Sequence, residues 1–327
     1  MKLAIIGAGV AGLSLASLLK DHAEVQLFEK SRGLGGRMSS RRALPYAFDH
    51  GAQYFTARSA EFKKFIQPWK DKGLIRRWNA RYVKFDEDQI IEHHPWVEGE
   101  PRYVGVPGMS AVAKMLSQGL HIELNTDIKC CQHREKWTLI DSVGSHYGKF
   151  DWVISTVPAP QAAVILPQTF KHHAAVKAIQ MSGCVALMLG FERGVPLSFD
   201  AAHVTGAAIS WIAVNSSKPG RAHPFSLIAH SSKQYAKAHV NETSEEVMQH
   251  LLSETSRLTG HDLNHAQYKA VHRWRYAHNV HNDAVGPLYI DKESKLAACG
   301  DWCLGGRVEG AFTSALRLAN ALKESFL

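Results

Sequence analysis

Three glycines near the start of the chain have the spacing of a dinucleotide-binding turn. They are Gly7, Gly9 and Gly12, and they follow the apolar segment 2–6. Gly7 allows a tight turn, Gly9 lets the backbone approach a pyrophosphate, and Gly12 lets a helix pack closely on the strand. The N-terminus of that helix offers unpaired N–H groups to phosphate oxygens. The glycines therefore predict a phosphate-binding turn between a strand and a helix.

Glu29 stands about 20 residues further along, directly after a second apolar segment, 24–28. A carboxylate at this place accepts hydrogen bonds from the ribose hydroxyls of an adenosine and repels a 2′-phosphate. Together with the glycine turn it predicts a dinucleotide site that disfavours NADP. The alternative is a glycine-rich turn in an unrelated α/β domain.

The segment after Glu29 favours FAD over NAD as the bound dinucleotide. Gly35, Gly36 and Arg37 complete an E-x5-G-G-R pattern, which resembles the glutathione-reductase-type FAD proteins and, among them, the amine-oxidase branch. In that group the glycine pair approaches the pyrophosphate, and the planar arginine grips oxygen anions with two bonds. The alternative is a solvated basic loop.

A second motif lies at the other end of the chain. Gly300 and Asp301 follow an expected strand, and residues 306–310 lead into the last helix. In FAD enzymes of this group the aspartate binds the ribityl or phosphate region. The dipole of the following helix stabilises the anionic reduced flavin. The two motifs are therefore expected to converge on one cofactor, although Asp301 could also serve as a turn cap.

Hydrophobic periodicity predicts α/β segments at both ends and a strand-rich middle. The expected strands are 2–6, 24–28, 121–125, 137–140, 152–157, 185–191, 207–214, 225–230, 269–276 and 296–299. The expected helices are 10–20, 60–72, 110–117, 244–258 and 309–322. Thr243 and Glu246 fit a capping box at the start of the fourth helix, and Gly260 fits its end. Residues 82–102 show no clear period.

The motifs lie in longer segments that resemble the bacterial renalase family of FAD-dependent oxidases. The segments are FEKSRGLGGRMSSRR (28–42), DHGAQYFTAR (49–58), YVGVPGMSAV (103–112), STVPAPQA (155–162), SWIAVNSSKPGR (210–221), HRWRYA (272–277) and CGDWCLGGRVEGAF (299–312). The resemblance implies a glutathione-reductase-type Rossmann domain, α/β in class, with a mixed-sheet α+β substrate domain, the para-hydroxybenzoate-hydroxylase-like arrangement.

We expect the FAD-binding domain to be discontinuous, with residues 1–60, 103–158 and 286–327, and the substrate domain to hold 61–102 and 159–285. The boundary at 158 rests on Pro158 and Pro160, because proline cannot donate a hydrogen bond to a strand ladder.

The resemblance implies oxidation of NAD(P)H isomers that carry the hydride at the 2 position, or the 6 position in the wider family. The hydride passes to non-covalent FAD, and oxygen then takes the electrons to give hydrogen peroxide and NAD(P)+. By position, the expected cofactor-binding residues are Gly7, Gly9, Ala11, Gly12, Glu29, Lys30, Gly36, Arg37, Gln53, Tyr54, Ile128 and Asp301. The expected substrate-binding residues are Trp211, Asn215, Trp274 and Tyr276.

No side chain is expected to be catalytic, because hydride transfer needs a stacked ring and excluded water rather than a nucleophile. Aromatic walls such as Trp211, Trp274 and Tyr276 suit that role, and the alternative for each is an ordinary core or sheet aromatic. Thirty-eight Lys and Arg against 30 Asp and Glu give a net charge of +8, which would attract a pyrophosphate-bearing substrate but is equally compatible with general solubility. The basic pairs are scattered, so no nucleic-acid partner is expected.

Four other features of the sequence do not indicate a leader, a membrane span, a metal site or a covalent flavin. The first segment could pass for a secretory signal, but its glycine spacing favours strand–turn–helix. No other segment reaches the roughly 18 apolar residues of a membrane span. The 19 histidines lack ligand spacing for a metal. Cys303 lies too close to Asp301 to match the flavin-linked cysteine of monoamine oxidases. The five cysteines indicate free thiols in the cytoplasm.

Two other functions remain open from the sequence. A flavin-containing amine oxidase shares the E-x5-G-G-R pattern, and a flavin-binding protein without turnover would carry the same cofactor motifs.

Overall fold

A parallel sheet forms around β1 (Lys2–Ile6), whose apolar side chains are buried on both faces of the sheet. In this computed structural model, which describes residues 1–97, 99–221, 224–281 and 286–325, the strand order is β19–β20–β13–β1–β2–β9. The other strands of this sheet are β2 (Glu24–Phe28), β9 (His121–Glu123), β13 (Trp152–Ser155), β19 (Tyr289–Asp291) and β20 (Leu296–Ala298), and β1 lies between β13 and β2. β19 pairs antiparallel with β20, and the other pairs are parallel.

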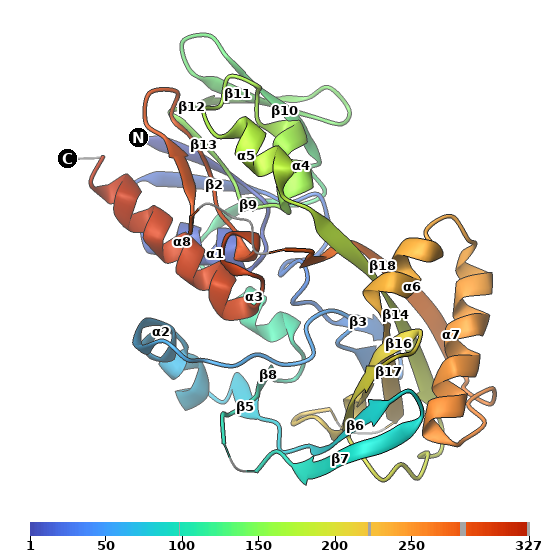
Figure 1. Ribbon diagram of the computed structural model, residues 1–327. Helices are drawn as coiled ribbons and strands as arrows, with labels where there is room; N and C mark the ends of the chain where they lie inside the picture. Colours follow the sequence, from blue (N-terminus) through green and yellow to red (C-terminus); the bar gives the residue numbers. More distant parts are fainter. Residues whose placement is uncertain (98, 222–223, 282–285, 326–327) are drawn as a thin grey trace.

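Alternation along β1 divides its side chains between two layers. Leu3 and Ile5 share a core with α1 (Val10–Leu19), α2 (Ala60–Asp71), α3 (Ser110–Leu116) and α8 (Val308–Lys323). Ala4 and Ile6 face the three-stranded sheet β10 (Ile128–His133), β11 (Trp137–Asp141) and β12 (His146–Phe150), with α4 (Ala159–Ile165) and α5 (His173–Ala178). We call this assembly the first lobe; most of it occupies the upper part of Figure 1, and α2 lies below the rest at the left.

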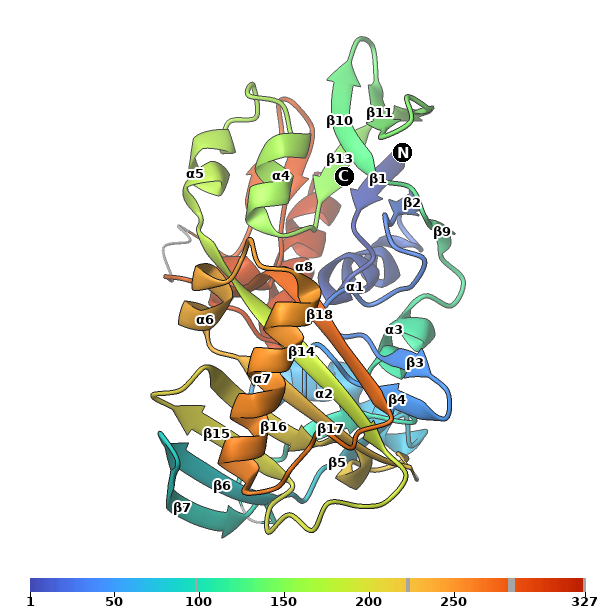
Figure 2. The same ribbon diagram turned by 90° about the vertical axis from the view of Figure 1, so that its right-hand side faces the viewer.

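The second lobe is built on a seven-stranded mixed sheet with the order β18–β14–β17–β16–β15–β6–β7. Its strands are β6 (Arg81–Asp86), β7 (Gln89–Pro95), β14 (Met181–Phe191), β15 (Ala201–Thr205), β16 (Ile209–Val214), β17 (Phe225–Ser231) and β18 (Tyr268–Asn279). α6 (Lys233–Ala238) and α7 (Ser244–Thr259) cover one face. In Figure 2 the long strands β14 and β18 lead from the first lobe into the second.

The period of two along β17 gives this sheet two different faces. Leu227 and Ala229 belong to the core under α7, whereas Ser226 and His230 line the cleft described below. Two small sheets connect the lobes, one of β3 (Arg41–Ala43) and β4 (Tyr46–Phe48), the other of β5 (Ile75–Arg77) and β8 (Tyr103–Gly105).

The predicted fold class is confirmed, and the capping box and left-handed Gly260 of α7 are as expected. Residues 82–102, by contrast, contain most of the hairpin β6–β7. Nearly every residue of β7 is exposed on the sheet edge, so no buried alternation marks it in the sequence.

The structure also divides the chain differently from the boundary expected at Pro158. α4 begins at Ala159, with Pro160 in its first turn, where a proline is tolerated. Residues 159–179 pack in the core of the first lobe. Phe62 and Ile66 of α2, also expected in the second domain, belong to that lobe as well.

Candidate active site

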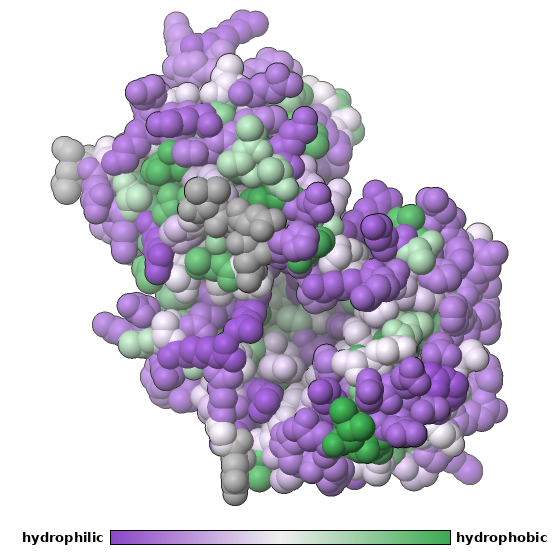
Figure 3. Space-filling model, viewed as in Figure 1, coloured by the Kyte–Doolittle hydropathy of each residue, from purple (hydrophilic) through white to green (hydrophobic). Residues whose placement is uncertain are grey.

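A cleft of about 2780 Å³ lies between the two lobes. Figure 3 shows the molecule hollowed between them. The glycine turn, the segment after Glu29 and the first turn of α8 line it from the first lobe. The sheet face of β16, β17 and β18 lines it from the second lobe. The cleft therefore joins the segments that the sequence associates with the cofactor and with the substrate.

The glycine turn has the geometry that a phosphate needs. Gly7 has φ +102, and a Cβ on Gly12 would lie 2.0 Å from the Gly7 carbonyl oxygen, so both positions require glycine. A Cβ on Gly9 would meet nothing within 4 Å, because this residue faces the open cleft. Gly9 caps α1 without any side-chain hydrogen bond. The first N–H groups of the helix thus remain available to an anion.

Glu29 is held in place at the end of β2, where it lines the cleft. Its two carboxylate oxygens accept hydrogen bonds from the backbone N–H groups of Ala8 and Ser31, each at 2.9 Å. A carboxylate oxygen can accept more than one hydrogen bond, so Glu29 keeps acceptor capacity for ribose hydroxyls. The next loop is tied to the turn, since the Gly35 N–H donates to the Ala8 carbonyl at 2.9 Å.

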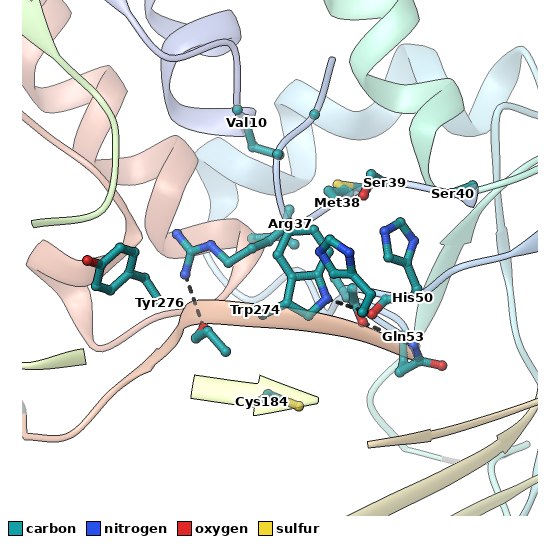
Figure 4. Close-up of a pocket in the computed structure, with 18 of the residues that line it drawn as sticks. Val10, Arg37, Met38, Ser39, Ser40, His50, Gln53, Cys184, Trp274 and Tyr276 are labelled. Carbon is teal, nitrogen blue, oxygen red and sulfur yellow. Dashed lines mark hydrogen bonds between the residues drawn. The ribbon is translucent and has the colours of Figure 1, made fainter. Parts of the chain in front are cut away.

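The two ends of the chain meet at Arg37 and Asp301, which are 264 positions apart in the sequence. The guanidinium donates to both carboxylate oxygens, at 2.9 and 2.5 Å. It also donates to the Ala277 carbonyl at 3.1 Å, the contact drawn beside Arg37 in Figure 4. The expected convergence of the two motifs is therefore present, with the two residues bonded to each other.

Most of the expected cofactor residues border the same cleft. They are Gly7, Gly9, Ala11, Glu29, Lys30, Gly36, Arg37, Gln53, Tyr54, Ile128 and Asp301. Gly12 lies behind them, where it lets α1 pack against the turn.

Three of the four expected substrate residues line the cleft on the second lobe. Trp211 lies on β16, and Trp274 and Tyr276 lie on β18. The Trp274 indole stacks on His50 at 5.2 Å and donates to the His50 carbonyl at 2.9 Å, as Figure 4 shows. Asn215 does not line the cleft. It is buried, and its amide donates to the Ala47 carbonyl at 2.9 Å.

Sequence reasoning missed a buried group of charges beside the cleft. Asp49 pairs with Arg221 and lies 3.5 Å from the Lys218 ammonium, and all three side chains are almost completely buried. Burial raises the pKa of Asp49, but the two cations, together with hydrogen bonds from the Met109 N–H and the Ser40 hydroxyl, hold that pKa below its usual value. Burial lowers the pKa of Lys218 to about 8. Asp49 and Lys218 lie in two of the quoted segments, but nothing in their spacing pairs them.

This charge group also fixes Gln53. The Lys218 ammonium donates to the Gln53 side-chain oxygen at 3.0 Å. The Gln53 amide nitrogen therefore points the other way, and it donates to the carbonyls of Asp49 and Gly51. It also lies 3.4 Å from a ring nitrogen of His230.

The histidines on the second-lobe side of the cleft are neutral near pH 7. Burial lowers the pKa of His50 to about 4 and that of His230 to about 3. Burial also lowers the pKa of His272, whose ring lies 4.8 Å from that of His50. The substrate side of the cleft is thus lined with uncharged rings.

Two sequence families match this chain. Residues 5–69 match an NAD(P)-binding Rossmann-like domain, and residues 78–323 match the flavin containing amine oxidoreductases. The chain is a flavin-dependent oxidoreductase of the amine-oxidase type. It belongs to the flavin containing amine oxidoreductase family, and FAD is its cofactor.

Solved structures share the fold over the whole chain. A protein from Exiguobacterium sp. 255-15 that has been assigned as a protoporphyrinogen oxidase superposes with a TM-score of 0.79 at 13% identity, covering 99% of both chains. An engineered double mutant of putrescine oxidase gives a TM-score of 0.70 at 12% identity, covering 98% of both chains.

A closer match in sequence is local. The 4,4′-diapophytoene desaturase of Staphylococcus aureus strain Newman is 44% identical over an alignment of 103 positions, which covers 28% of this chain. This chain spans only 19% of the desaturase.

The residues present fit FAD. The open space above Gly9, the uncapped start of α1 and the Glu29 carboxylate at the end of β2 are what a bound adenosine diphosphate requires. The start of α8 also lacks a side-chain cap and borders the cleft, where it can face a flavin ring. Among the described residues, no helix is both long and apolar enough to span a bilayer.

Proposed function

We propose that this protein is an FAD-dependent oxidase of the renalase type. The net reaction is oxidation of the 2-dihydro isomers of NAD(P)H, and of the 6-dihydro isomers, by molecular oxygen to NAD(P)+ and hydrogen peroxide. In this proposal the cofactor is held non-covalently by the residues around the glycine turn, Glu29, Arg37 and Asp301. The chain's similarity to amine oxidases leaves their activity as the competing function.

The charge of the cleft is the observation that carries this proposal. Within the described part of the chain, four acidic residues line it, and each is already bonded to another group of the protein. Backbone amides hold Glu29, Arg58 holds Glu100, Lys129 holds Asp127, and Arg37 holds Asp301. A substrate ammonium would therefore find no unpaired carboxylate among the described lining residues. Lysines and arginines outnumber acids there, which favours an anionic substrate.

The uncharged rings that line the cleft on the second-lobe side favour a substrate with a flat ring. Bound FAD supplies a hydride acceptor and a route for electrons to oxygen. The chain's own part is to stack the substrate ring, keep out water and hold the reacting atoms close together. Trp211, Trp274 and Tyr276 offer apolar surface. The neutral His50 and His230 add no positive charge that would oppose the one that the nicotinamide ring acquires when it loses a hydride.

The partners in this proposal are a dinucleotide substrate and molecular oxygen, with neither a nucleic acid nor a membrane. A cytoplasmic location is part of it, and the five free cysteines support a reducing compartment.

Anaerobic mixing tests this function. The FAD-loaded protein is mixed with 2-dihydro-NAD, 6-dihydro-NAD, ordinary NADH and a simple amine such as putrescine, and the flavin absorbance is followed. We expect rapid bleaching by a dihydro isomer, slow bleaching by NADH and none by the amine. Readmitted oxygen should restore the absorbance and yield one hydrogen peroxide per substrate oxidised.

Other results would favour a different function. Rapid bleaching by the amine with none by the isomers would identify an amine oxidase. A flavin that no donor reduces would identify a flavin-binding protein without turnover. Efficient reduction by ordinary NADPH would indicate a reductase.

A further inference from the structure

The Cζ of Arg102 lies over the ring of Trp96, 4.0 Å from its centroid, and 5.9 Å from the centroid of Tyr54. Contact through the face of a guanidinium leaves the N–H groups along its edge free for planar, bidentate bonds to phosphate oxygens.

The aromatic support under Arg102 is rigid. Trp96 is 3% exposed, and its ring stacks with Tyr82 at 5.1 Å and with Trp211 at 6.0 Å. Trp78 closes the edge of the Trp96 ring at 5.5 Å. A side chain held in this way loses little conformational freedom when it binds a ligand.

The nearby charges leave Arg102 available. Glu100 is the acidic neighbour that feels the charge of Arg102, but both of its oxygens are bonded by Arg58, at 2.6 and 2.9 Å. Arg307, at the start of α8, also lines the cleft and adds positive charge near Glu100. The positive charge in this part of the cleft is therefore only partly neutralised.

A second unsatisfied donor belongs to another residue that contacts Trp96. The indole N–H of Trp211 is buried and donates to no described group. A buried donor without a partner is costly, so an acceptor oxygen of a ligand would stabilise it. Trp211 and Arg102 both line the cleft, and both contact the ring system of Trp96.

We propose that Arg102, resting on Trp96 beside Tyr54, binds the pyrophosphate of the dinucleotide substrate. This inference rests on the proposed function and adds a recognition residue to it. Arg102 would then let the protein bind a dinucleotide more tightly than a dihydronicotinamide nucleoside, which has no phosphate. Its positive charge would also repel a substrate ammonium.

Substrates of decreasing length test the proposal. Steady-state constants are measured for 2-dihydro-NAD, for the 2-dihydronicotinamide mononucleotide and for the riboside, which has no phosphate. Arg102→Met keeps apolar contact with Trp96 but removes the charge. We expect KM for 2-dihydro-NAD to rise about 10-fold with kcat unchanged. KM for the riboside should not change. The change in KM for the mononucleotide measures how much of the effect of Arg102 one phosphate is sufficient to produce.

Two further variants separate the charge from general damage. Arg102→Lys should recover part of the loss, because it keeps the charge but not the planar fork. Arg76→Met is the matched control, since Arg76 is exposed on β5 and does not line the cleft. It should leave every constant unchanged. Equal effects of Arg102→Met on the dinucleotide and the riboside, or no effect on either, would overturn the proposal.

Binding of ADP-ribose, which has no nicotinamide, keeps this test independent of the proposed function. Its affinity is measured by the quenching of tryptophan fluorescence in the FAD-loaded protein. We expect Arg102→Met to weaken it about 10-fold relative to Arg76→Met. Equal affinities refute the role of Arg102 even if the isomers are oxidised. Weakened ADP-ribose binding in a protein that oxidises no isomer supports the site and rejects the reaction.

Discussion

Glu29 is the residue with the clearest single role in the cofactor site. Its carboxylate is fixed by the N–H groups of Ala8 and Ser31, and it faces the cleft with acceptor capacity left over. Glu29→Ala removes the ribose acceptor, so we expect FAD binding to weaken by about 1–3 kcal/mol. The dissociation constant of FAD from deflavinated protein measures this.

Glu24→Ala is the matched control for that variant, because Glu24 begins the same strand with an exposed side chain paired to Lys2. It should leave the dissociation constant unchanged. A Glu29→Ala protein that retains FAD as tightly as the Glu24→Ala protein would remove Glu29 from the site.

The cleft histidines make the folded state sensitive to acid. The pKa values of His50 and His230 are lowered to about 4 and about 3 in the folded protein, and both return to about 6.5 on unfolding. Below pH 6.5 the unfolded chain therefore binds protons that the folded chain does not. The free energy of unfolding is full above that pH and falls as the pH drops toward 4.

His230→Gln removes one of these titrations. Between pH 7 and pH 5, the loss of unfolding free energy should be smaller than in the parent by at most about 2 kcal/mol. Urea unfolding at the two pH values measures it. His121→Gln, at an exposed position on β9, should leave the loss unchanged. An identical pH dependence in the parent and His230→Gln would show that His230 does not stay neutral on folding.

At this scale, prediction succeeded where local spacing carries the signal. Gly7, Gly9 and Glu29 follow a fixed distance rule along a strand–turn–helix, and the structure places all three at the cleft. Asp49 and Lys218 are 169 positions apart, so only the fold brings them together. Asn215 was expected over the flavin because of its segment, but its side chain points into the buried charge group, where it accepts from Lys218 at 3.2 Å.

Among the elements, the junction of β1 and α1 offers the sharpest test. A Cβ at position 12 would lie 2.0 Å from the Gly7 carbonyl, whereas one at position 9 would meet no protein atom within 4 Å. Gly12→Ala should destabilise the deflavinated protein by about 3 kcal/mol, because backbone must move. Gly9→Ala should leave that stability unchanged but weaken FAD binding at least about 10-fold, because its methyl group occupies the phosphate space.

Urea unfolding and FAD titration of the two deflavinated variants measure this pair of effects. The two variants thus control for each other. Full FAD affinity in the Gly9→Ala protein would place the pyrophosphate elsewhere.

Elements with their own local signals were predicted well. The capping box of α7 and the period of β1, α1 and β2 gave bounds close to those observed. The hairpin β6–β7 carries no such signal, because its outer strand is exposed on almost every residue. Its place in the sheet is set by pairing of β6 with β15, which lies far along the chain.

At the scale of the whole molecule, buried charges connect the two lobes. Asp49 accepts a hydrogen bond at 2.9 Å from the N–H of Met109, which lies in the core of the first lobe, whereas Lys218 and Arg221 follow β16 of the second lobe. Asp49→Asn leaves two buried cations without their carboxylate, so we expect a loss of about 3–5 kcal/mol in the free energy of unfolding. Urea unfolding measures this loss.

Asp200→Asn is the control, because it breaks an aspartate–arginine pair whose Arg81 is half exposed. It should cost at most about 1 kcal/mol. Similar losses in the two variants would show that the buried group does not stabilise the joined lobes.

The division of the chain into two lobes depends on contacts between residues far apart in the sequence, and local sequence patterns do not predict such contacts. Two prolines end the expected strand at 158, but the chain continues as α4 and α5 on the first sheet, where Ala162 and Val176 are fully buried. The two termini of the described chain also lie in that lobe (Figure 1). The sequence predicted that the Arg37 and Asp301 motifs lie close together, because both motifs are typical of binding sites for the same cofactor. In the structure the two side chains are hydrogen-bonded to each other.

The visible absorption spectrum of the purified protein is the most direct test of the claim that these chain ends meet around one flavin. We predict a yellow protein with one FAD per chain, released into solution when the protein is denatured. A colourless protein that takes up no flavin after incubation with FAD would contradict the account.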